Sequence, residues 1–178
     1  MEKPPFLLRN PYKAAFLAWL VPGLGHFYQG RVGKGWLYAI CILSLYFAGL
    51  ALGEGKIVYW RWVNPLHSPD KFCLYYVGQF FTGLPALPAL IQGTLRYFGI
   101  PPLLGGFMAE PDMNVLNGLH PRLSKLVEVG TIYTTVAGLL NVLAIFDALE
   151  GPAYAEEDAA EETSSVKGLG GLNVEIQG

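Results

Sequence analysis

The sequence predicts an all-α fold: an integral membrane bundle of about four transmembrane helices that begins with a helical hairpin. Of its 178 residues, 52% are hydrophobic and only 15% are charged. The apolar residues are gathered into blocks longer than the core helix of a soluble protein needs, and such blocks are typical of membrane spans. The predicted spans cover residues 11–28, 36–53, 72–92 and 131–149.

The first span is predicted to start at Asn10 and Pro11, since Asn is a preferred N-cap and Pro is tolerated at the first helical position. Pro22 cannot donate a hydrogen bond to the carbonyl of Ala18, so we expect a kink there. In lipid, that carbonyl needs a partner from the protein. The face around Ala18 is therefore predicted to pack on another helix.

The stretch between the first two spans, residues 20–35, reads LVPGLGHFYQGRVGKG. It resembles the signature of the two-transmembrane hairpin domain, in which glycines precede a Phe-Tyr pair and a glycine and a basic residue follow. It is also similar to small bacterial multi-pass proteins of unknown function. One departure is Gln29, where the common turn carries Asp or Arg. The resemblance implies a membrane hairpin and brings no catalytic residues with it.

The candidate site is this turn. Its predicted role is structural, and the alternative role is a contact with lipid. Arg31 and Lys34, set among backbone N–H groups of a glycine-rich turn, could hold an anionic headgroup. Tyr28 and Trp36 would flank that headgroup. The site residues are Pro22, Gly23, Gly25, His26, Phe27, Tyr28, Gly30, Arg31 and Lys34.

The same glycines do not form a nucleotide site. A phosphate-binding loop needs a glycine where Tyr28 stands and a hydroxyl residue where Gly35 stands. The dinucleotide pattern also fails at Tyr28, and no strand precedes it. No cofactor is predicted. Nucleic acid is excluded as a partner, because the chain has neither a basic face nor a stacking array.

Prolines and one amide mark the later spans. Pro85 and Pro88 are predicted to bend or break the third span, and a cleft at Pro22, Pro85 and Pro88 would give a transport role. Asn141 lies near the middle of the fourth span and is predicted to make a packing hydrogen bond. Gly49 and Gly53 favour close packing of the second span, within the chain or, as the alternative, at a dimer interface.

The chain divides into four segments by composition. These are a lead and hairpin over residues 1–53, an interfacial loop over 54–71, the third and fourth spans with their connection over 72–149, and an acidic tail over 150–178. Cys41 and Cys73 are predicted to be buried free thiols. No metal site is predicted. Glu110 and Asp112 form a turn signal, since acid–base chemistry needs a burial that the sequence does not indicate.

Four spans would put both termini on one side and the turn at residues 20–35 on the other. Six basic residues against five weakly favour cytoplasmic termini, and the predicted location is a bacterial inner membrane. The leading hypothesis is a non-enzymatic membrane protein whose helices pack on themselves, on a second copy or on a partner protein. Lipid binding at the turn and transport through the proline cleft are the alternatives.

Overall fold

The computed structural model describes residues 10–64, 66–67, 72–112, 114–115 and 125–150. Within these ranges the fold is all-α, as predicted, and contains no strand. The lead before Asn10 and the acidic tail beyond residue 150 lie outside the described residues. So does Pro121, which favours a helix start because proline is tolerated at the first helical position. The helices are α1 (Pro11–Leu20), α2 (Leu24–Tyr28), α3 (Val32–Leu52), α4 (Leu74–Phe80), α5 (Leu87–Tyr97) and α7 (Leu126–Glu150), with short 3-10 turns η2 (Leu84–Ala86) and η3 (Leu104–Gly106).

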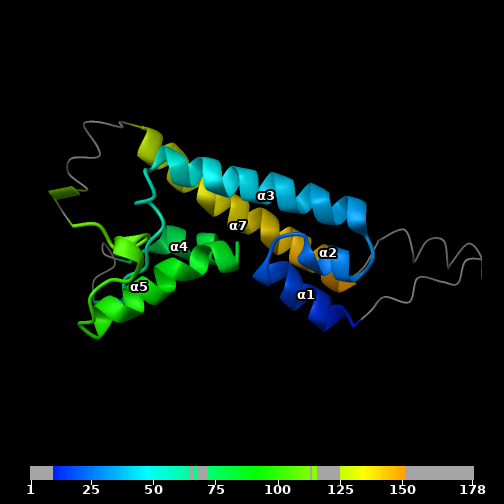
Figure 1. Cartoon of the computed structure of the whole chain (residues 1–178), viewed down its shortest axis with the longest axis horizontal. Helices are drawn as coiled ribbons and strands as arrows, with labels where there is room; N and C mark the ends of the chain where they lie inside the picture. The colour runs from blue at the N-terminus through cyan, green and yellow to red at the C-terminus, as the bar shows by residue number, and fades with distance from the viewer. Residues whose placement is uncertain (1–9, 65, 68–71, 113, 116–124, 151–178) are drawn as a thin grey trace, which may run out of the picture.

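Two long antiparallel helices form the frame of the molecule (Figure 1). Helix α3 has 21 residues and α7 has 25, which makes both long and apolar enough to cross a membrane. At one end of the pair, Gly49 packs against the backbone of Gly130. At the other end, Arg31 forms an ion pair with Asp147. At 1.5 Å per residue, α3 is about 31 Å long, close to the thickness of a hydrocarbon core.

The first predicted span is two helices that double back on each other. Helix α1 starts at Pro11, and the side chain of Asn10 accepts hydrogen bonds from two backbone N–H groups, as predicted. The helix ends at Leu20, because Val21 before Pro22 is extended and Gly23 takes a positive φ of 86°. The kink predicted at Pro22 is therefore a complete reversal. Figure 1 shows α2 returning beside α1 toward the end from which the chain entered.

The third predicted span is also a hairpin of short helices. Helix α4 runs inward along α7, since Gln79 Nε2 donates to Thr134 Oγ1 at 2.8 Å. The chain reverses around Gly83, whose φ is +81°, and α5 runs back to the segment that follows α3, where Gly93 packs against Trp60. Pro85 and Pro88 stand in the first turns of η2 and α5, where a proline needs no donor. Where four spans were predicted, the described residues thus form two long helices and two half-length hairpins.

The two hairpins enter from opposite ends of the bundle, and their tips touch in the middle (Figure 1). A Cβ on Gly83 would overlap the carbonyl oxygen of Trp19, so the two backbones are in direct contact. Only glycine allows this approach, because it lacks a side chain and tolerates the positive φ. The reversals of α1 and α4 therefore meet each other instead of facing outward.

Asn141 joins both hairpin tips to α7. Its Nδ2 donates to the carbonyl of Ala18 at 3.1 Å and to that of Phe81 at 2.8 Å. The predicted partner for the Ala18 carbonyl and the predicted packing role of Asn141 are both confirmed. Among the described residues, Asn141 Oδ1 and the neighbouring Thr82 Oγ1 are buried and make no hydrogen bond.

Replacing Asn141 by leucine is expected to lower the free energy of unfolding by about 1 to 2 kcal/mol, because two tip carbonyls lose their donor. Thermal unfolding in detergent measures the effect. The control is Thr135→Val, since the Thr135 hydroxyl donates within its own helix, to the Thr131 carbonyl. An equal effect of the two substitutions would contradict the bridging role of Asn141.

Two buried tyrosines hold the second tip from the other side. Tyr46 of α3 donates its hydroxyl to the Pro85 carbonyl at 3.1 Å, and Tyr76 of α4 donates to the Ala86 carbonyl at 2.8 Å. The carbonyls released by the reversal therefore have donors from the protein.

Both cysteines are free thiols, as predicted. Their predicted burial is wrong for Cys41, which lies on the exposed face of α3, while Cys73 is half-buried. Of the predicted glycine pair, Gly49 packs against α7, and Gly53 is covered by Ile57. These contacts lie within the chain.

Candidate functional site

A charged cluster lies at the end of the bundle where α3 begins and α7 ends. Asp147 accepts a hydrogen bond from His26 Nε2 at 2.8 Å and two from Arg31 Nη2, at 2.9 and 3.0 Å. The Lys34 ammonium is 3.3 Å from the same carboxylate. We call these four residues the Asp147 cluster. It brings together three residues of the predicted turn and one residue far away in the sequence.

The local fold explains how these side chains converge. Helix α2 carries His26 beside α7, and Arg31 and Lys34 belong to the N-terminal end of α3, which starts next to the last turn of α7. Arg31 Nη1 also donates to the Asp147 carbonyl at 3.1 Å. Gln29 Nε2 donates to the Ala148 carbonyl at 2.6 Å. The turn thus supplies donors and positive charge to a helix C-terminus, which lacks both.

The burial of the cluster decides what it can do. The Arg31 side chain is 8% exposed and that of Asp147 is 22% exposed, so this pair is largely withdrawn from solvent. Lys34 is 44% exposed and keeps donors free on its outer side. An ionised carboxylate only accepts hydrogen bonds, so the bonding proton of His26 is on Nε2. His26 Nδ1 is buried without a partner in the described part of the chain.

A match over most of the sequence assigns the family of this chain. The model described as "Family of unknown function (DUF6677)" matches residues 13–161. The chain belongs to the DUF6677 family. No curated protein and no solved structure matches it. The matched range includes all four residues of the Asp147 cluster, both long helices, the second hairpin and all but the first two residues of α1 in the first hairpin of this DUF6677 chain. The resemblance to the two-transmembrane hairpin domain stays a prediction.

The structure separates the predicted site residues of the DUF6677 chain into two groups. Pro22 and Gly23 lie at the first hairpin tip, in the middle of the bundle, while the others lie toward the Asp147 cluster. Gly25 packs against the backbone of Ala14. The remaining members are His26, Arg31 and Lys34 in the cluster, Phe27 stacked edge-on against Trp36, Tyr28 packed near the Ala14 side of α1, and Gly30 with a φ of +80°.

Sequence reasoning missed Asp147 as a site residue. Asp147 is the first charged residue in the fourth predicted span, and it lies near the end of that span. An acidic residue in the last turn of a membrane helix needs a nearby cation, so Asp147 was a signal for an ion pair. Arg31 and Lys34 are the basic residues of a turn predicted at a span end, which is a second signal for the same pairing. The predicted topology hides the match, because it places the turn and the end of the fourth span on opposite sides.

A second ionic cluster lies at the opposite end of the DUF6677 fold. Glu110 forms ion pairs with Arg61 and with Arg96, whose Nε is 3.2 Å from the carboxylate. The hydrogen bond to Glu110 raises the pKa of the Arg61 guanidinium above its ordinary value. The Glu110 side chain is only 10% exposed, so the expectation that this acidic turn lacks burial is wrong for Glu110. The cluster ties the segment after α3 to the segment after α5.

Tyr59 lies close in sequence to Arg61 of this second cluster, and its burial raises the pKa of the Tyr59 hydroxyl above its ordinary value. The predicted interfacial loop over residues 54–71 includes Trp60 and Trp62, of which Trp62 is exposed and Trp60 is partly covered. The Trp62 indole donates to Thr94 Oγ1 at 3.1 Å, which joins this segment to α5. The Glu110 ion pairs and the Trp62–Thr94 hydrogen bond thus join the segment after α3 to α5 and the segment that follows it.

Proposed function

We propose that this DUF6677 protein is a non-enzymatic integral membrane protein that works by packing its helices on a second copy or on a partner protein. In this proposal α3 and α7 cross the bilayer, while the α1–α2 and α4–α5 hairpins enter from opposite faces and return. The observation that carries it is the apolar character of the exposed faces of α3 and α7, between two ionic clusters at the ends of the bundle.

Large apolar side chains cover these outer faces. In a soluble protein, so extensive an exposed apolar surface would cause aggregation. In lipid it is the expected surface, because contact between apolar side chains and acyl chains carries no free-energy cost. The exposed residues are Trp36, Leu37, Ile40 and Phe47 on α3, and Ile132, Val136, Leu139, Leu143 and Phe146 on α7.

The hairpin tips support the same proposal. Non-helical backbone is tolerated at membrane depth only where protein or water satisfies its polar groups. Asn141, Tyr46 and Tyr76 donate to four carbonyls at the two tips. The tips are therefore compatible with the middle of a bilayer.

The structure favours packing over the two alternative functions. The lipid role proposed for the turn loses its main cation, because Arg31 is committed to Asp147. The transport role needs a passage at Pro22, Pro85 and Pro88, whereas the tips that hold these prolines pack directly on each other. A bacterial inner membrane remains the proposed location.

Side-specific labelling tests the proposed topology. In a Cys41→Ser, Cys73→Ser background, Tyr12→Cys at the start of α1 and Gly33→Cys at the start of α3 are expected to react with a membrane-impermeant maleimide from the same face of sealed vesicles. Lys125→Cys, before α7, is the control and should react from the opposite face. All three positions are exposed. Labelling of the first two from opposite faces would mean that residues 11–28 cross the membrane.

The proposed packing role has its own test. Mass determination of the full chain in mild detergent should find more than one copy, or a stoichiometric partner protein. A monomer accompanied only by lipid would contradict this role while leaving the topology untouched.

A further inference from the structure

His26 of α2 is a fully buried histidine in the Asp147 cluster. Its Nε2 donates to the Asp147 carboxylate at 2.8 Å, whereas its Nδ1 is buried and has no partner in the part of the chain that the structure describes. In the neutral imidazole this Nδ1 is an acceptor only. A protonated imidazole would carry a second N–H at Nδ1, and that donor would be buried without an acceptor.

The charges around His26 also oppose its protonation. Asp147 of α7 faces the Nε2 atom, but this carboxylate already pairs with Arg31 and Lys34 at the start of α3. Glu150, one turn further along α7, is exposed. With two cations beside one carboxylate, the surroundings of His26 carry an excess of positive charge. A third cation at this position is therefore unfavourable.

The remaining titratable groups near His26 supply no second anion. In α1, α2 and the first two turns of α3 they are Tyr12, Lys13, Tyr28 and Tyr38. A tyrosine hydroxyl is neutral near pH 7 and a lysine is a cation. The Tyr38 ring covers the imidazole, with the two ring centroids 4.7 Å apart. Burial lowers the pKa of His26 below its ordinary value, and the hydrogen bond to Asp147 offsets only part of that effect.

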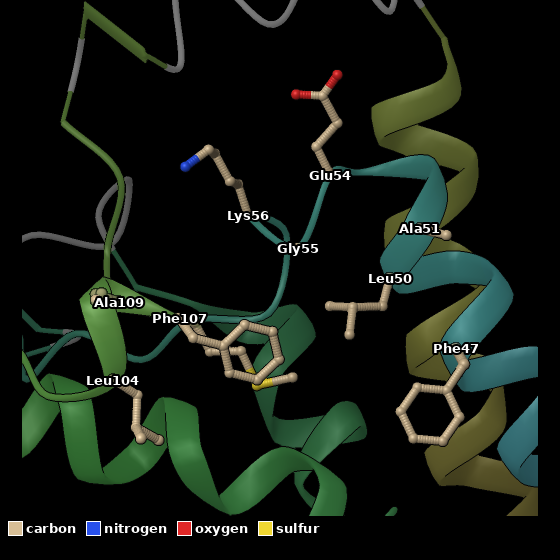
Figure 2. Close-up of a pocket in the computed structure, with 12 residues that line it drawn as sticks. Phe47, Leu50, Ala51, Glu54, Gly55, Lys56, Leu104, Phe107 and Ala109 are labelled. Carbon is tan, nitrogen blue, oxygen red and sulfur yellow. The ribbon is translucent and has the colours of Figure 1, made fainter.

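The opposite end of α3 has a different setting for its charged side chains. Figure 2 shows Glu54 and Lys56 on the rim of an open groove of about 550 Å³, above the apolar side chains of its walls. Both residues are exposed, so water screens their charges. His67, the other histidine that the structure describes, is exposed as well. Within the described residues, a buried histidine is thus found at the Asp147 end.

We propose that His26 makes the docking of α2 on α7 sensitive to acid: the neutral imidazole holds α2 against the last turns of α7, and the protonated imidazole releases it. On protonation by solvent, the new Nδ1–H and the added charge both need water. Water reaches them when α2 moves away from α7. This inference goes beyond the proposed packing function, and it depends on contacts within the chain whether or not α3 crosses a bilayer.

Thermal unfolding of the full chain in detergent, at about pH 7.5 and about pH 5.5, tests this proposal. The released histidine binds a proton more readily than the docked one, so the docked form loses stability as the pH falls below the ordinary histidine pKa of about 6.5. The midpoint of the wild type should fall by about 2 to 4 °C. His26→Gln keeps an N–H for Asp147 but does not titrate, and it should lose most of this shift. Equal shifts in the two proteins would overturn the proposal.

Two matched controls make the pH response specific to His26. The sequence contains two other histidines, His67 and His120. Their substitutions, His67→Gln and His120→Gln, make the same chemical change elsewhere in the chain and should keep the shift of the wild type. A loss of the shift in either control as large as in His26→Gln would overturn the assignment to His26.

A second measurement shows which contact opens. In the background without native cysteines, Ala148→Cys places a thiol at a buried position of α7, whose carbonyl accepts from Gln29 beside α2. Its reactivity with a maleimide is divided by that of the exposed Gly33→Cys at the same pH, which cancels the effect of pH on the thiol. This ratio should rise severalfold between about pH 7.5 and about pH 5.5. A ratio that does not rise would mean that α2 stays docked, and it overturns the proposal even if His26→Gln does not fold.

Discussion

Replacing Asp147 by alanine is expected to lower the free energy of unfolding by about 3 kcal/mol, at the low end of the range for breaking a buried ion pair because the carboxylate is partly exposed. The substitution removes the acceptor of His26 and the ion-pair partner of Arg31. Arg31 is left with a buried charge that only neutral oxygens contact. For a chain of this size the midpoint of thermal unfolding in detergent should fall by about 6 to 12 °C.

Glu150→Ala is the matched control for Asp147→Ala. It removes an acidic side chain one turn further along α7, where the residue is exposed. Its effect should stay within about 0.5 kcal/mol, as for most surface substitutions. Combining Arg31→Met with Asp147→Leu should give a protein more stable than either single variant, because neither charge is then left unpaired. Equal effects of Asp147→Ala and Glu150→Ala would contradict the cluster as a stabilising contact.

Replacing Gly25 by alanine is expected to destabilise the fold by about 2 to 3 kcal/mol, the upper part of the range for overpacking. A Cβ at this position would overlap the carbonyl oxygen of Ala14 and crowd the Ala18 side chain. This contact exists only because α2 doubles back on α1. In one kinked helix the same substitution would stabilise by up to about 1 kcal/mol, since alanine is the better helix former. The sign of the change therefore distinguishes the hairpin from a continuous span.

Gly33→Ala is the control for Gly25→Ala, because Gly33 lies in the first turn of α3 and an added Cβ there meets no atom within 4 Å. It should be neutral or slightly stabilising. The comparison is made by thermal unfolding of both variants at one scan rate in the same detergent. A stabilising effect at both positions would mean that residues 11–28 form a single helix.

Local features of the first helix could be predicted from the sequence. The Asn10 cap and the start at Pro11 depend on neighbouring residues only, and the structure has both. The need of the Ala18 carbonyl for a donor follows from the position of Pro22, four residues later. That the donor is Asn141 could not be deduced, since it depends on which helices become neighbours. The packing role of Asn141 was predictable, because an amide in an apolar span needs a partner.

The hairpins could not be predicted from hydropathy, because a kinked span and a doubled-back pair of half-helices have the same composition. The conformational signals were present. Pro22-Gly23 is a strong turn dipeptide, and Gly83 precedes Pro85 in a similar way. A hydropathy prediction compares the length of an apolar block with the thickness of a membrane. It therefore interprets these turn signals as kinks within one span. The turn residues of the candidate site could be predicted, because they are contiguous in the sequence. Asp147 could not, because it meets them only in the folded chain.

The order of elements along the chain has a consequence for insertion. A half-length hairpin followed by a full-length helix occurs twice, first as α1–α2 with α3 and then as α4–α5 with α7, and the second unit enters from the opposite end. Turned upside down in a bilayer, the protein presents a similar architecture, so the fold itself does not specify which way up it sits. Among the described residues, three basic side chains lie at the Asp147 end and four at the other. If α3 and α7 cross a bilayer as proposed, adding or removing two positive charges at one end is expected to change the orientation of the molecule, because basic residues near the span ends set orientation.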